Sequence, residues 1–193
     1  MIKSKIFVVA LTFLLCFSCR EDPVPKPKAL LRLDYPKAEY KDIETDLPFT
    51  FEKNTLAQRL KKIKIDANSN SFGINVEYPT LKGTIYLTYI KVTEDNLIPL
   101  IRDSQNLTQE HTQKANAIEG DFYENKDHKV YGMFYEVGGN AASQAQFYVT
   151  DSVNHFLNGS LYFYAKPNYD SILPAADYLK KDIKRLMETL KWK

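Results

Sequence analysis

The fold of this chain follows from residues 72–92, which read FGINVEYPTLKGTIYLTYIKV. Apolar and polar side chains alternate on both sides of the central PTLK, a pattern typical of two half-buried strands joined by a turn. Residues 72–78 and 83–92 therefore predict a β-hairpin. One face of its second strand would carry Ile85, Leu87 and Tyr89.

Further strands are predicted on both sides of this hairpin. Residues 48–52 alternate Phe49 and Phe51 with polar residues, whereas residues 29–47 predict little regular structure. Asn158-Gly159 matches a hairpin turn, but only three residues separate it from the preceding loop, so we prefer a glycine bulge within one strand. The remaining strands are predicted at 120–125, 129–138, 143–151 and 156–165.

Two helices complete the predicted domain. The first begins after Asp95 or Asn96, with Pro99 in its first turn and an apolar stripe of Leu97, Leu100, Ile101, Leu107, Ala115 and Ile118. The second covers 170–190, capped by Asp170 or Ser171, with Pro174 in its first turn and a stripe of Ile172, Leu179, Ile183, Leu186, Met187 and Leu190. About six antiparallel strands flanked by two main helices make an α+β domain. By analogy, this order of elements resembles the Mog1/PsbP-type α/β/α sandwich.

The first nineteen residues carry a lipoprotein signal. Lys3 and Lys5 precede an apolar run, residues 6–17, that suits a signal peptide and is too short to span a bilayer. The run stops at Ser18-Cys19, a small residue directly before a cysteine. We therefore predict cleavage between Ser18 and Cys19 and lipidation of Cys19, where two or more acyl chains would give a lasting membrane anchor.

Two other interpretations of the leader are weaker. Cys16 and Cys19 have the C-x-x-C spacing of a redox dithiol, but such a site needs an electropositive, partly exposed helix start, and this pair ends an apolar leader. Cleavage before Cys16 is disfavoured because the bulky Leu15 precedes it.

The sequence thus divides into a signal peptide (1–18), a lipidated tether (19–28) and a single globular domain (29–193). Prolines at alternate positions keep the tether extended, and at about 3 Å per residue it would hold the domain roughly 25 Å from the lipid surface. Of 26 basic residues two lie in the leader, so the mature chain carries 24 basic against 24 acidic residues. This neutral balance argues against nucleic acid as a partner. Only the lipidated cysteine survives processing, so no disulfide is expected.

Candidate catalytic and metal-binding residues are few. His111, His128 and His155 have no second histidine or cysteine at metal-ligand spacing, so no metal or cofactor is predicted. We interpret His111 as a hydrogen-bonded histidine at the edge of the buried face of the first helix. Asp151, Ser152 and His155 suggest a hydrolase, but three near neighbours on one turn cannot orient a nucleophile and its base.

Paired aromatic residues such as Phe147-Tyr148 permit two interpretations. They could form a stacking platform for a sugar or a base, or they could fill a core on both faces of one sheet. Core packing is the simpler explanation, provided that a helix covers each face.

Several segments resemble the gliding-motility lipoprotein GldD family of Bacteroidetes. They are PKPKA (25–29), YPKAEY (35–40), PFTFE (48–52), GTIYLTY (83–89), residues 146–164, and KPNYDS (166–171). The resemblance covers essentially the whole mature chain. It implies an envelope lipoprotein needed for gliding and for the associated type IX secretion machinery, and it supplies no active-site residues.

Two functional hypotheses follow. The first is a non-enzymatic assembly or stabilising component, anchored in the outer membrane on its periplasmic or cell-surface side, that binds other gliding or secretion proteins. The second is an envelope enzyme or glycan-binding module. A deep polar cleft with convergent carboxylates or His155 would favour the second, and an exposed apolar patch would favour the first.

We predict that Cys19→Ala blocks incorporation of labelled lipid and releases the protein from membranes, because no other lipidation site survives cleavage. Metabolic labelling with a fatty acid, followed by membrane fractionation, checks this. If labelling persists in Cys19→Ala and is lost in Cys16→Ala, the assigned cleavage site is wrong.

Overall fold

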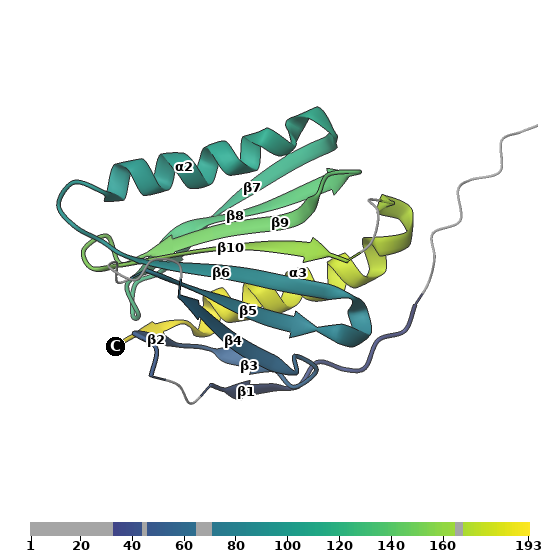
Figure 1. The fold of residues 1–193 in the computed structure, drawn as a ribbon, viewed down its shortest axis with the longest axis horizontal. Helices are drawn as coiled ribbons and strands as arrows, with labels where there is room; N and C mark the ends of the chain where they lie inside the picture. The colour runs from purple at the N-terminus through teal and green to yellow at the C-terminus, as the bar shows by residue number, and fades with distance from the viewer. Residues whose placement is uncertain (1–32, 44–45, 65–70, 165–167) are drawn as a thin grey trace, which may run out of the picture.

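A seven-stranded antiparallel sheet lies between two helices in the computed structural model of this chain (Figure 1). The structure describes residues 33–43, 46–64, 71–164 and 168–193. The predicted α+β class, with a sheet flanked by helices, is confirmed. Ser18, Cys19 and the tether lie outside the described residues. Within the described ranges, no helix is long and apolar enough to cross a bilayer.

The sheet has the strand order β4-β5-β6-β10-β9-β8-β7. Its strands are β4 (Arg59–Lys64), β5 (Phe72–Tyr78), β6 (Gly83–Lys91), β7 (Ala115–Asn125), β8 (Val130–Gly139), β9 (Ser143–Thr150) and β10 (His155–Phe163). Two small sheets pair β1 (Tyr40–Asp42) with β3 (Glu52–Asn54), and β2 (Phe49–Thr50) with β11 (Lys191–Trp192). The helices are α2 (Leu97–Gln109) and α3 (Tyr169–Thr189), and short 3-10 turns form η1 (Pro79–Leu81) and η2 (Glu110–Gln113).

The hairpin predicted from residues 72–92 is confirmed. Strands β5 and β6 pair from Phe72↔Tyr89 to Tyr78↔Gly83, and η1 forms the connection. Lys82 ends this turn with a left-handed backbone conformation, φ 51°. The three side chains predicted on one face of β6 are buried: Ile85, Leu87 and Tyr89.

Each helix covers one face of the sheet, which explains the adjacent aromatic residues. On β9, Phe147 belongs to the larger core, which also contains Leu179 and Ile183 of α3. The next residue, Tyr148, belongs to a smaller core against which Leu100 of α2 packs. Successive strand residues point to opposite faces, so both rings are covered.

Strand β4 lies outside every predicted strand, and β7 begins at Ala115, before the strand predicted at 120–125. Strand β4, RLKKIK, was not predicted because its lysines obscure the apolar alternation. Ala115 and Ile118, predicted on the stripe of the first helix, lie in β7 instead, because α2 ends at Gln109 and η2 follows it. Strand β7 is exposed or half-buried along its whole length, so it lacks the alternation that marks a half-buried strand.

Three local predictions also need correction. Helix α3 begins at Tyr169, earlier than predicted, so Pro174 is its sixth residue and lies beyond the first turn. Strand β10 pairs through Asn158 and Gly159 without a register shift, so these residues form no bulge. Gly159 instead makes room for the ring of Phe147, which a Cβ at this position would overlap. Residues 40–42, expected to be irregular, form β1.

Two glycines in strand interiors should respond differently to alanine. A Cβ at Gly132 would overlap the carbonyl oxygen of Tyr148, and that backbone is fixed by strand pairing. A Cβ at Gly73 would meet no atom closer than 3.7 Å. Gly132→Ala should therefore lower the free energy of unfolding by about 1–3 kcal/mol or more, whereas Gly73→Ala should be neutral or slightly stabilising. Equal losses in denaturant titrations would contradict this strand packing.

Candidate functional site

The cluster of Asp151, Ser152 and His155 singled out from the sequence lies where the C-terminus packs against the sheet. His155 Nδ1 is 2.9 Å from the hydroxyl oxygen of Tyr89. The ring of His155 stacks on Trp192, with centroids 5.0 Å apart and planes 7° apart. The indole of Trp192 donates to the carbonyl of Lys129 at 3.1 Å. His155 therefore joins β6, β10 and the C-terminal residues, and its Nδ1 pairs with Tyr89 rather than with Ser152.

Asp151 shapes the turn between β9 and β10. Its Oδ1 accepts backbone N–H bonds from Val153, Asn154 and His155, at 3.0, 2.8 and 2.8 Å. Burial acts to raise the pKa of this carboxyl, but the three backbone bonds outweigh burial and hold the pKa below its usual value. Ser152 adopts a left-handed conformation in the same turn, φ 66°. Both residues are thus accounted for by turn geometry.

The other two histidines lie elsewhere. His111 is half-buried in η2, directly after α2, and its buried Nε2 has no hydrogen-bond partner among the described residues, so the predicted hydrogen bond is not found at this nitrogen. Burial lowers the pKa of His111. His128 lies in the β7–β8 turn and lines a polar hollow of about 240 Å³ with Trp192. The described residues contain no group of three His, Cys, Asp or Glu side chains placed to hold a metal ion.

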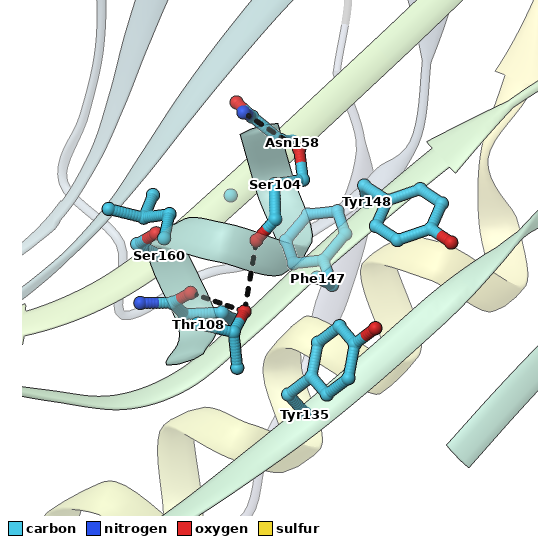
Figure 2. Close-up of a pocket in the computed structure, with 10 residues that line it drawn as sticks. Ser104, Thr108, Tyr135, Phe147, Tyr148, Asn158 and Ser160 are labelled. Carbon is cyan, nitrogen blue, oxygen red and sulfur yellow. Dashed lines mark hydrogen bonds between the residues drawn. The ribbon is translucent and has the colours of Figure 1, made fainter. Parts of the chain in front are cut away.

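A small polar cavity separates α2 from the sheet (Figure 2). Thr108 Oγ1 lies 2.7 Å from Gln146 Oε1 and 3.1 Å from the carbonyl oxygen of Ser104. Asn158 Nδ2 is 3.5 Å from Ser104 Oγ. The cavity volume of about 10 Å³ is close to that of a single water molecule. The hydrogen bonds beside this cavity hold α2 against the sheet, and the cavity has no room for a substrate.

Ser104 and Thr108 belong to the buried face of α2, although the predicted apolar stripe does not include them. They are buried, whereas Leu107, predicted on the apolar stripe, is 37% exposed. Positions 97, 100, 101, 104 and 108 form one helical face, so helical spacing alone could have indicated them. Their polarity concealed this role.

An open groove lies between the edge strand β7 and the C-terminal half of α3. We call it the β7–α3 groove; its volume is about 190 Å³, and its lining residues are Asp121, Phe122, Tyr123, Phe134, Lys184, Met187 and Glu188. Phe134 and Met187 are buried members of the larger core and contribute its apolar side. Phe122 is 69% exposed, and because it pairs with Met133 its ring lies on the α2 side of β7, on the opposite face of the strand from Asp121 and Phe134. An apolar groove and an exposed ring on the same edge strand are typical of a binding surface.

The cations beside this groove are already paired. Lys184 Nζ lies 2.8 Å from Glu136 Oε1 and 4.8 Å from the ring centroid of Phe134. Lys180, only 10% exposed at its side chain, lies 3.1 Å from the other oxygen of Glu136. Burial acts to raise the pKa of Glu136, but the two lysines outweigh burial and lower it. Glu136 thus fixes Lys184 against the wall of the groove.

The family model for the gliding motility lipoprotein GldD matches residues 20–192. The chain belongs to the GldD family. The resemblance noted in the sequence is confirmed, and membership makes this protein a lipid-anchored gliding-motility lipoprotein of the cell envelope. A comparison with curated proteins finds no match.

This GldD-family lipoprotein also buries a carboxylate, Asp182 of α3. The carboxylate accepts hydrogen bonds from the Tyr40 hydroxyl at 2.7 Å and from Asn54 Nδ2 at 2.9 Å. Burial raises the pKa of Asp182, and the hydrogen bonds oppose that effect only in part. The donors come from β1 and β3, so the cluster joins the N-terminal segment to α3. Among the cavities described above, none is lined by Asp182, which favours a structural role.

The pH dependence of stability should reveal Asp182. Its folded pKa lies above the ordinary value of 3.8, so its contribution to stability is full below pH 3.8 and is lost as the pH rises through the folded pKa. Asp182→Asn should therefore gain stability relative to wild type as the pH rises from 3.8. Tyr40→Phe removes a hydrogen bond that lowers the pKa of Asp182, so this variant should lose more stability than wild type as the pH rises. Urea titrations across this range check both, and identical pH profiles for wild type and Asp182→Asn would contradict the assignment.

Proposed function

We propose that this lipoprotein is a non-enzymatic assembly or stabilising component of the gliding apparatus and the associated type IX secretion machinery. It is held at the outer membrane through lipidated Cys19, with its domain on the periplasmic or cell-surface side. It acts there by binding other proteins of that machinery. The single observation that carries this proposal is the edge strand β7, which has the β7–α3 groove on one face and the exposed ring of Phe122 on the other.

The groove has the composition of a protein-binding surface. Its apolar part is rigid, because Phe134 and Met187 are also packed in the core. Its border is charged, and the exposed ring of Phe122 lies on the other face of the same edge strand. Protein interfaces combine an aromatic or aliphatic centre with a polar rim in this way.

A tyrosine cluster supports glycan binding as a second candidate function. The hydroxyl oxygens of Tyr86 and Tyr164 lie 2.9 Å apart, and Tyr162 packs edge-on against Tyr86 with centroids 5.8 Å apart. Tyr164 is 66% exposed. An exposed ring with hydroxyls nearby suits the apolar face and hydroxyl groups of a sugar. Saturation-transfer NMR with peptidoglycan fragments, compared between wild type and Tyr164→Ala, tests this candidate.

The main proposal predicts a functional difference between two exposed apolar residues. Phe122 and Val153 are 69% and 66% exposed, and only Phe122 lies on β7, the edge strand that borders the groove. Phe122→Ser should reduce partner recovery after cross-linking in intact cells about tenfold or more, as expected when an interface anchor worth about 1.4 kcal/mol or more is removed. Gliding speed should fall with it. Val153→Ser, at equal abundance, should leave both unchanged.

Two results would contradict the proposal. One is equal partner recovery and gliding in the Phe122→Ser and Val153→Ser strains. The other is loss of gliding in His128→Ala at normal abundance and with normal partner recovery, which would indicate catalysis.

A further inference from the structure

Strand β7 ends the sheet and leaves its outer side open. Its inner side pairs with β8 from Ala115↔Gly139 to Asn125↔Val130, and no described strand pairs with its outer side. The central residues Glu119, Gly120 and Asp121 are exposed. An edge of this kind presents unpaired backbone N–H and C=O groups along its length. It is therefore a template on which another strand can form.

The open edge is acidic on the side of the groove. Glu119 pairs across the sheet with Glu136, and Asp121 pairs with Phe134, so both carboxylates lie on the face covered by α3. Neither forms an ion pair with the described side chains. The groove's own cation, Lys184, is held by Glu136. A complementary ligand would therefore bring positive charge.

The shape and chemistry of the groove favour a long cationic side chain. The stem of a lysine or arginine can lie on apolar surface while its charged head reaches a carboxylate. Here Phe134 and Met187 provide the apolar surface, and Asp121 provides the carboxylate. A volume of about 190 Å³ leaves room for one such side chain.

Protection against aggregation is the usual reason for charges on an edge strand. The acidic residues do oppose pairing of β7 with β7 of a second copy, because like charges would face one another. Protection alone does not explain why an exposed Phe122 and an apolar groove adjoin the same edge. Exposed apolar groups promote aggregation, so they would not be expected on an edge whose charges serve only to prevent it, whereas they do add surface for binding.

We infer that an extended segment of a partner protein, with Lys or Arg at alternating positions, adds to β7 as a further strand and places one cationic side chain in the β7–α3 groove. Backbone hydrogen bonds to β7 provide affinity, and the alternation of side chains along a strand provides specificity. This inference rests on the proposed protein-binding function and specifies the chemistry of the partner.

The test uses full-length lipidated protein in detergent micelles and three labelled probe peptides. The first is TKVKTKVKT, the second is the same sequence with all backbone amides N-methylated, and the third is TEVETEVET. The N-methylated peptide keeps its side chains and charges but cannot donate backbone hydrogen bonds. Fluorescence anisotropy measures the dissociation constants. We expect the first peptide to bind at least tenfold more tightly than either of the others.

Two charge variants provide matched controls. Asp121→Lys should weaken binding of TKVKTKVKT at least tenfold. Asp170→Lys makes the same charge change at an exposed residue in the first turn of α3 and should have little effect. Equal losses in the two variants, or equal binding of the N-methylated peptide, would reduce the interaction to non-specific attraction and overturn the inference.

Two further outcomes would also overturn it. One is self-association of the full-length protein, detected when a cysteine introduced in β7 forms a cross-link with a cysteine introduced in β4 of another copy. The occupant of the edge would then be a second copy. The other is absence of binding by TKVKTKVKT. If Phe122→Ser still reduces partner recovery in cells in that case, only strand addition fails; if it does not, the proposed function fails as well.

Discussion

Helix α3 packs on one face of the sheet, and the other contacts of the fold depend on that packing. Leu179, Ile183 and Met187 are fully or almost fully buried against the strands. Burial of such side chains contributes roughly 1.5–3 kcal/mol each, so together they approach the net stability of a domain, about 5–15 kcal/mol. The same helix binds the N-terminal segment, through Asp182 to Tyr40 and through Arg185 to Glu52 at the strand β3.

The packing of α3 also determines the candidate binding surface. Ile183 and Met187 face the sheet, and the neighbouring Lys184 and Glu188 then stand beside β7 and form the wall of the β7–α3 groove. The carboxylate of Glu136 holds Lys184 in place through an ion pair. A groove built on a buried helix and a sheet is preformed, so a partner would lose little free energy in ordering it. This links the core of the domain to its proposed role in assembly.

The hairpin at 72–92 and the stripe of α3 could be predicted from the sequence because both combine strong periodicity with large apolar residues. Strand β4 could not, since its lysines hide the alternation, and only residues 120–125 of β7 are predicted as a strand, because this exposed edge strand has no buried face. The groove could not be predicted either. Asp121 and Met187, which line it, are far apart in the chain, and only the tertiary packing of α3 on the sheet places β7 beside the end of this helix. Cys19 remains a prediction from the leader.

Hydrogen–deuterium exchange on the lipidated protein, alone and in complex with the partner captured from cells, tests the central claim most directly. Exchange in peptides covering residues 115–125 reports on the open edge of the sheet, because unpaired edge amides exchange more readily than paired ones. We expect the partner to slow exchange in this strand and in the C-terminal half of α3. Protection confined to other surfaces, with residues 115–125 unchanged, would contradict the account.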